Sequence, residues 1–198
     1  MLLVRGFHYG MFTAITPMMG ANYVGWDEAA ITAAAGTAQL VAGILGLTLG
    51  GWLGDRFGAK RTTIAFFALY ITFSGVMLMT QSQWADSRYF MFFVYSWYAL
   101  DILITVAALP ISMRLCDQSV AATQFTLYMA CSNLGITIGA TVFGFSDQLG
   151  GLTTMFMIVM ALHFVGLMVM LFARFPRRAG YEETKVLAEA PGPAPRIN

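Results

Sequence analysis

GWLGDRFGAKR, residues 51–61, joins two long apolar segments of this chain through a very short polar turn. Gly58 suits a tight reversal, because glycine has no Cβ to obstruct it. Asp55 is placed to cap the start of the following helix or to accept hydrogen bonds from a neighbouring helix end. The basic residues of the turn are Arg56, Lys60 and Arg61. They favour the anionic inner leaflet of a membrane, so this stretch predicts a cytoplasmic turn between two membrane helices.

The composition around this turn is that of an integral membrane protein. Of the 198 residues, 58% are hydrophobic and 11% are charged, whereas soluble domains average roughly 45–50% and about 25%. A soluble domain with so few charges would lack the polar surface that keeps it in solution. The composition therefore excludes a cytosolic enzyme, a secreted disulfide scaffold and a disordered chain. The net charge of +1 leaves no basic face for a nucleic-acid partner.

Charged residues divide the chain into six apolar segments, each long enough for the roughly 20 residues that a membrane helix needs. The first segment is the most polar, with His8, Thr13 and Asn22 inside it, so we expect it to be buried among the others. The predicted fold class is all-α: a polytopic membrane protein whose six transmembrane helices form one bundle over residues 1–175. The spans lie near 5–25, 29–53, 62–81, 89–113, 121–146 and 152–173.

Lysines and arginines indicate the orientation of these spans. An even number of spans places both ends of the bundle on one side, and that side carries all of the 11 basic residues except Arg88. We therefore predict an inner or plasma membrane protein with both termini in the cytoplasm. Residues 176–198 are rich in proline and mixed charge, which predicts a flexible cytoplasmic tail.

Residues 51–61 resemble the signature of the major facilitator superfamily, which lies between the second and third helices of each six-helix half. The resemblance implies a transporter in which two bundles rock against each other, with this loop as a latch that stabilises one face of the cycle. Ala59 departs from the signature, where a basic residue is usual, and Arg61 stands close enough to compensate. The latch residues implied are Gly51, Leu53, Asp55, Arg56, Gly58 and Lys60, together with Arg61.

A second stretch, residues 116–127, resembles the C-terminal half of the muropeptide permease and acetyl-CoA transporter branch, mainly through its ATQF core at 122–125. The span near 89–113 has Pro110 but no internal arginine, and the next span has no proline, unlike an N-terminal half. The resemblance therefore implies the C-terminal six-helix half of a secondary transporter. Its partners would be the lipid bilayer, a small-molecule solute and a second six-helix bundle, either a copy of this chain or a separate half.

Asp101 is the strongest candidate for a functional side chain. An ionisable group near the middle of a span is costly and normally faces a bundle interior or a water-filled cavity. At helical spacing it shares one face with Trp97, Tyr98 and Thr105. A carboxyl group in this position is a candidate proton carrier. The alternative is a structural carboxylate that hydrogen-bonds to a neighbouring helix.

Further polar side chains in the spans suit the wall of a cavity for protons and solute. His8 lies near the cytoplasmic start of the first span and is a candidate partner of Asp101, although a lone histidine there is more often structural. The other candidates equally suit hydrogen bonds between helices. They are Tyr9, Gln39, Gln124 and Asn133.

Two spans carry stripes of small residues, which let helix backbones approach closely. Each stripe packs either within this bundle or against the second bundle that the resemblance implies. The stripes are Ala38, Ala42, Gly46, Gly50 and Gly54 in the second span, and Gly135 and Gly139 in the fifth.

Nothing in the sequence favours an enzyme or a bound cofactor. The chain has no G-x-S-x-G or H-E-x-x-H pattern, and Cys116 and Cys131 are too far apart for a CxxC site. We expect no catalytic residue, no metal and no cofactor. The alternative to a transporter half is a membrane protein of the same fold that does not transport, acting as an interaction protein or as an incomplete transporter fragment.

Overall fold

The computed structural model describes residues 2–117 and 119–173, and these ranges are helical without any strand. The predicted all-α fold is confirmed. α2, η2 and α3 form one continuous helix, so six long helices run through the described part of the chain. The predicted tail at 176–198 lies outside it. The elements are α1 (Leu2–Met19), η1 (Gly20–Val24), α2 (Glu28–Leu45), η2 (Gly46–Gly50), α3 (Gly51–Phe57), α4 (Ala59–Met79), η3 (Gln81–Gln83), α5 (Ser87–Arg114), α6 (Ala121–Gly144) and α7 (Gly151–Phe172).

Five of these long helices are apolar enough to cross a membrane, namely the continuous helix 28–57 and α4 to α7. α1 does not reach that apolar level, because it carries Arg5 and His8. Its polar side chains are covered by the other helices: His8 is fully buried and Thr16 nearly so. This is the burial that the sequence predicts for its most polar segment. The chain is therefore a multi-pass integral membrane protein.

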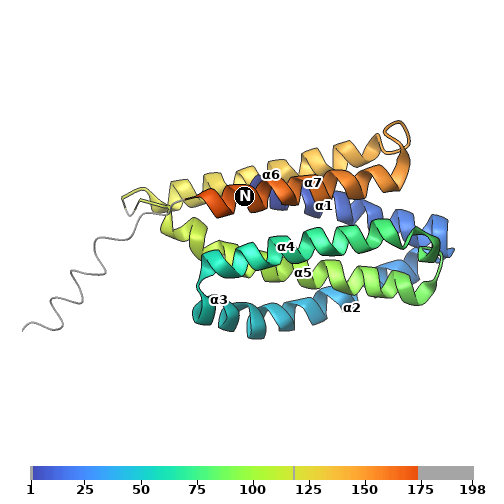
Figure 1. The fold of residues 1–198 in the computed structure, drawn as a ribbon, viewed down its shortest axis with the longest axis horizontal. Coiled ribbons are helices and arrows are strands. Elements are labelled where there is room, and N and C mark those ends of the chain that lie inside the picture. Colours follow the sequence, from blue (N-terminus) through green and yellow to red (C-terminus); the bar gives the residue numbers. More distant parts are fainter. Residues whose placement is uncertain (1, 118, 174–198) are drawn as a thin grey trace, which may run out of the picture.

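The helices lie side by side along the long axis of the molecule (Figure 1). The most extensive contacts are those of α1 with α6, α4 with α7, α2 with α5, and α4 with α5. α4 and α5 thus link the group formed by α1, α6 and α7 to the continuous helix 28–57. This arrangement brings side chains of α1, α4, α5 and α7 together in the interior, although they are far apart in sequence.

The interior is filled by aromatic rings, with Phe12 of α1 at their centre. The Phe12 ring stacks on Trp97 with ring centroids 5.4 Å apart and on Phe93 at 5.8 Å. Tyr70 of α4 and Phe156 of α7 meet it edge-on. Since aromatic pairs in these geometries add stability beyond their buried area, α1 is held firmly between α4, α5 and α7.

Glycines allow the backbones of α1 and α6 to touch. A Cβ on Gly6 or Gly10 would collide with the backbone of α6, and a Cβ on Gly135 or Gly139 would collide with the backbone of α1. The fifth-span stripe therefore packs within this bundle, against a matching pair of glycines on α1. Such small-residue crossings are a common way for membrane helices to associate.

The second-span stripe packs against α5. Ala38 and Ala42 are buried, while Gly46 and Gly50 lie against the side chains of Ile102 and Val106. Gly54 has open space around its Cα, so the stripe ends before it. Most of this stripe thus also serves packing within the bundle.

The turn after α3 differs in one respect from the prediction. Gly58 has a φ of +83°, a conformation that glycine adopts without strain, and it closes the reversal as expected. However, α4 begins at Ala59 without any side-chain cap. Asp55 does not cap that helix, because α3 continues to Phe57 and keeps Asp55 within its own last turns.

Candidate functional site

A two-point ion pair joins α1 to α5. The Arg5 guanidinium donates from Nη2 to Asp101 Oδ2 at 3.1 Å and from Nε to Asp101 Oδ1 at 3.3 Å. The Asp101 side chain is 7% exposed, and that of Arg5 is 24% exposed. A carboxylate buried this deeply needs such partners, because an unpaired buried charge is strongly destabilising. Asp101 is thus paired across the interface between α1 and α5, and part of the Arg5 side chain remains exposed.

His8 is the second partner of Asp101, one helical turn further along α1. Its Nε2 lies 3.1 Å from Asp101 Oδ1, and its side chain is fully buried. The sequence placed His8 as a candidate partner of Asp101, and the structure brings these two side chains together. Two ionisable groups of α1 therefore share one carboxylate of α5.

Two further buried groups extend this cluster to α4 and α7. The His163 ring stacks on the Tyr70 ring, with centroids 4.2 Å apart and planes at 10°. The His8 ring lies against both, with its centroid 4.8 Å from that of His163 and 4.7 Å from that of Tyr70. We call Arg5, His8, Tyr70, Asp101 and His163 the ionisable cluster.

An aromatic face flanks the cluster on α5. The Trp97 and Tyr98 rings stack with centroids 3.7 Å apart, and Tyr9 meets Trp97 edge-on at 6.0 Å. Gln39 of α2 donates a hydrogen bond of 2.9 Å to the Tyr98 hydroxyl. The Arg5 guanidinium lies 5.4 Å from the centre of the Tyr9 ring. These predicted cavity residues therefore form one connected surface beside the Arg5–Asp101 pair.

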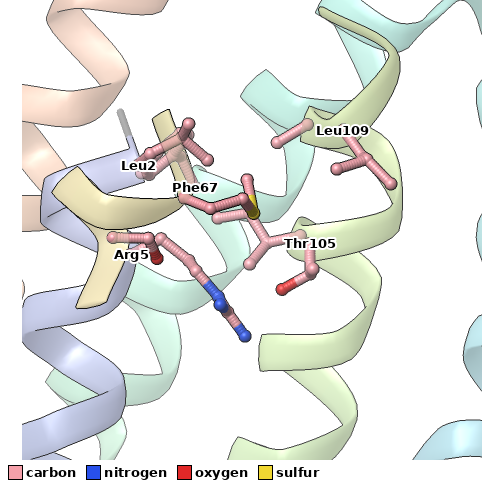
Figure 2. A pocket seen from close by; sticks show the side chains of 9 residues that line it. Leu2, Arg5, Phe67, Thr105 and Leu109 are labelled. Atoms are coloured by element: carbon pink, nitrogen blue, oxygen red, sulfur yellow. The ribbon is translucent and has the colours of Figure 1, made fainter. Parts of the chain in front are cut away.

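A small cavity opens next to Arg5, between α1, α4, α5 and α6. Its volume is about 50 Å³, which is enough to admit water, because one water molecule needs roughly 10–15 Å³ of such space. Figure 2 shows the Arg5 side chain reaching from its helix toward the one that carries Thr105 and Leu109. Most of the lining is apolar, and Ser132 adds a buried hydroxyl without a hydrogen-bond partner.

The remaining cavity candidates take other positions. Thr105 lines the small cavity and donates through its hydroxyl to the Asp101 carbonyl oxygen at 2.6 Å. Gln124 accepts a hydrogen bond of 2.7 Å from the Asp117 backbone N–H, at the loop before α6. Asn133 is exposed on α6. Neither Gln124 nor Asn133 hydrogen-bonds to the ionisable cluster.

Residues 51–61 lie at the end of the bundle where α7 also finishes. Lys60 donates to the carbonyl oxygens of Leu171 and Ala173, at 3.3 and 2.7 Å. It thereby binds the C-terminal end of α7, where a cation is favoured by the helix dipole. Arg56 lies over the rings of Trp52 and Phe57 on its own helix.

Other latch candidates have simpler surroundings. The Leu53 carbonyl accepts a hydrogen bond of 3.1 Å from the Thr62 hydroxyl, which ties α3 to α4. Asp55 and Arg61 are exposed, and Asp55 forms no ion pair with any residue in 2–117 or 119–173. Gly51, like Gly54, has open space where a Cβ would be.

The loop between α5 and α6 holds one carboxyl group with a shifted pKa. Asp117 Oδ1 accepts hydrogen bonds from the Ser119 hydroxyl at 2.6 Å and from the Ser119 N–H at 2.8 Å. These bonds favour the ionised form, and they hold the pKa of Asp117 below its usual value.

Three members of the ionisable cluster are not among the predicted site residues. Arg5 reads as the basic boundary of the first span, yet α1 begins at Leu2 and so includes it. His163 and Tyr70 sit in apolar spans that show no polar stripe. In the sequence, each of these two residues is only a polar side chain inside a long apolar segment. That pattern does not show which residues of other helices it contacts.

The cluster is suited to an exchange of ion-pair partners at Asp101. A single buried carboxylate is shared by a partly open guanidinium and a buried imidazole. In the described part of the chain, no three His, Cys, Asp or Glu side chains come together as metal ligands would.

Comparison with known proteins gives one match. The sequence profile described as Major Facilitator Superfamily matches residues 1–197. No curated protein and no solved structure matches the chain.

Proposed function

We propose that this chain, which belongs to the major facilitator superfamily of membrane transporters, moves a small solute across the bilayer by alternating access, in symport with protons. It would act as one six-helix half, with the solute bound near the middle of the membrane between two bundles.

The observation that carries this proposal is the position of Asp101 between Arg5 and His8. In an apolar interior the carboxylate must be balanced by a positive charge or by a proton. A proton that arrives in the cluster frees Arg5 from Asp101, so the contact between α1 and α5 differs between the protonated and deprotonated states. A ligand shifts a conformational equilibrium only through such a difference.

Proton coupling is tested in liposomes that contain the purified protein. A pH gradient, acidic outside, should accelerate uptake of a transported solute, sought among N-acetylglucosamine, a muropeptide, alanyl-alanine and lactate. Asp101→Asn should abolish the acceleration while the variant still folds. Asp147→Asn is the matched control, because Asp147 lies exposed in the turn before α7. Acceleration of wild-type size in Asp101→Asn would refute the proposed coupling.

A second bundle is proposed as the partner. Of the five apolar helices, α6 and helix 28–57 have the smallest buried shares. Asn133 lies on the open side of α6, and its amide has no hydrogen bond within the described residues. Since a carboxamide is unfavourable against lipid tails, this side is suited to a partner bundle or to a solute pathway.

The mass of the purified protein in detergent, corrected for bound detergent, tests this partnership. A stable dimer, or a complex with another six-helix chain, would support a two-bundle transporter. A monomer under all conditions would favour the alternative, a protein of this fold that does not transport or that forms part of a larger transporter.

The muropeptide permease branch remains a prediction from residues 122–125, since the comparisons match the superfamily as a whole. Saturable uptake of a muropeptide in the panel would support this branch. Uptake of lactate or alanyl-alanine alone would contradict it.

Both ends of the bundle are proposed to face the cytoplasm, on the distribution of basic residues. Cys116, in the loop after α5, is partly exposed and gives a direct test. In sealed cells a membrane-impermeant maleimide should not label it, and labelling should appear once the cells are opened. Labelling of Cys116 in sealed cells would reverse the orientation.

A further inference from the structure

We infer that the small cavity beside Arg5 binds a carboxylate group, and that the transported solute therefore carries one. The statement about the solute rests on the proposed function and deepens it by naming the class of solute. The statement about the cavity concerns binding alone, so it can be tested without transport.

The Arg5 guanidinium has hydrogen-bond donors that Asp101 does not use. An arginine side chain presents five N–H donors in a rigid planar fork. Asp101 occupies the edge formed by Nε and Nη2. The edge formed by Nη1 and the second hydrogen of Nη2 donates to no residue in 2–117 or 119–173. This second edge has the geometry that binds a carboxylate through two parallel hydrogen bonds.

The unused edge is accessible from the cavity side of α1. The Arg5 side chain is 24% exposed and lines the cavity (Figure 2). Nη1 does not occur among the fully buried side-chain atoms that lack a hydrogen bond, so solvent reaches it. The cavity volume of about 50 Å³ has room for about three non-hydrogen atoms, since one water molecule needs roughly 10–15 Å³ of such space. A carboxylate group has this size.

A buried hydroxyl of α6 adds a further donor. Ser132 lines the same cavity and is 4% exposed, and its Oγ has no hydrogen-bond partner. A buried polar group without a partner is costly, and a carboxylate oxygen would accept the hydrogen bond that this hydroxyl can donate. The Thr105 hydroxyl, which also lines the cavity, already donates to the Asp101 carbonyl oxygen. Ser132 is therefore the hydroxyl of the cavity that remains available to a ligand.

The rest of the lining suits the carbon atoms of an organic acid. It consists of apolar side chains, among them Phe67, Ile104 and Leu109. Carbon atoms of a ligand gain free energy when they are buried against such a wall. A small inorganic anion would lose its water there without this gain. The lining thus favours a carboxylate over chloride or phosphate.

The charge of Asp101 does not prevent a second carboxylate from binding. A ligand on the unused edge contacts the guanidinium directly and lies farther from the Asp101 carboxylate, so the attraction is the stronger of the two interactions. Asp101 also has a second partner, since His8 Nε2 lies 3.1 Å from its Oδ1. Asp101 therefore stays hydrogen-bonded when Arg5 shares its charge between two carboxylates.

Acetate gives a direct test, because it is a carboxylate with a single methyl group. Saturation-transfer NMR of that methyl group measures its binding to the full chain in lipid nanodiscs, at neutral pH and constant ionic strength. We expect saturable binding that lactate displaces. Acetamide, a neutral molecule of nearly the same shape, and chloride at equal concentration should displace little of it.

Two variants and one control locate the site. Arg5→Lys keeps the charge but replaces the fork by a point charge on a flexible chain, so acetate affinity should fall by about tenfold or more. Ser132→Ala removes only an unpartnered hydroxyl, so the fold should persist while affinity falls by about tenfold, as for the loss of one hydrogen bond to a charged group. Ser74→Ala removes a hydroxyl that is also buried without a partner but lies outside the cavity lining, and should leave affinity unchanged. If Arg5→Lys fails to fold, Ser132→Ala and Ser74→Ala still decide the outcome.

Four results would overturn the site. They are no saturable binding of acetate, displacement by acetamide as strong as by lactate, equally strong displacement by chloride, and wild-type affinity in Ser132→Ala.

Uptake assays separate this site from the proposed transport. Of the solutes in the uptake panel, only N-acetylglucosamine has no carboxylate, so it should not be taken up. Uptake of N-acetylglucosamine alone would refute the class of solute and leave transport standing. Acetate binding without uptake of any solute would leave the site standing and count against transport.

Discussion

Arg5 and Asp101, 96 residues apart in sequence, form a two-point ion pair between α1 and α5, with N–O distances of 3.1 and 3.3 Å. The first prediction follows from the cost of leaving either charge alone. Arg5→Gln and Asp101→Asn should each destabilise the bundle by about 3 kcal/mol, because each removes one partner of a buried pair. The double variant should lose much less than the sum, and reversible unfolding in mixed micelles measures all three.

Arg88→Gln and Asp147→Asn form the control cycle, because both residues are exposed and no ion pair joins them. Their effects should be small and additive. Full additivity in the Arg5 and Asp101 cycle as well would show that the pair contributes nothing to stability.

The second prediction concerns the contact between α1 and α6. Gly10→Ala adds a Cβ that collides with the Ile136 carbonyl oxygen, so the helices must separate. We expect a loss of roughly 1–3 kcal/mol, as for other overpacked sites. Gly36→Ala is the matched control, because that glycine has open space around it. It should be neutral or stabilising by up to about 1 kcal/mol. Equal thermal stability of the two variants would contradict the close crossing.

The third prediction concerns Lys60, which donates to the last carbonyl groups of α7. Lys60→Gln removes the charge at the C-terminal end of that helix and should lower stability by about 1 kcal/mol. Lys60→Arg keeps the positive charge and should retain most of the stability. Arg61→Gln, on an exposed side chain, should have little effect on stability. Hydrogen exchange of the last turn of α7 gives the local readout. Unchanged exchange in Lys60→Gln would argue against a capping role.

The fourth prediction concerns pH. The Ser119 hydrogen bonds lower the pKa of Asp117 in the folded protein, so their stabilising effect is present above the unfolded pKa and is lost as the pH falls through the folded value. Ser119→Ala removes the hydroxyl and should raise the pKa of Asp117 toward its ordinary value. NMR of the side-chain carboxyl carbon in labelled aspartate measures this pKa. The same titration in Ser87→Ala is the control, since Ser87 is remote in the chain.

The sequence predicted the helices and the central carboxylate because both depend on local patterns. Long uncharged segments indicate spans, and an acid in the middle of one indicates a polar interior. The ion pair between Arg5 and Asp101 was not predictable in the same way. A basic residue at the start of a span is usually a membrane boundary, and only the packing of α1 against α5 gives it a buried partner.

The neighbours of His163 were also beyond the sequence. Its span is the most apolar of the chain, and no periodic pattern connects it to His8 or Tyr70. Their meeting depends on how α1, α4 and α7 pack together. By contrast, Gly6 and Gly10 do carry a readable signal, a small-xxx-small spacing that matches Gly135 and Gly139.

The close packing of α1 against α6 has a consequence for biosynthesis. The ribosome makes α1 before the helices that cover it. Asp101, the partner of Arg5, is made 96 residues after Arg5. Until α5 and α6 emerge, α1 exposes an arginine and a histidine without partners, which opposes its entry into lipid. We therefore expect α1 to wait at the insertion machinery and to enter the bilayer after later helices. Nascent chains arrested before Gly139 should leave α1 open to proteases, whereas chains arrested after α6 should protect it.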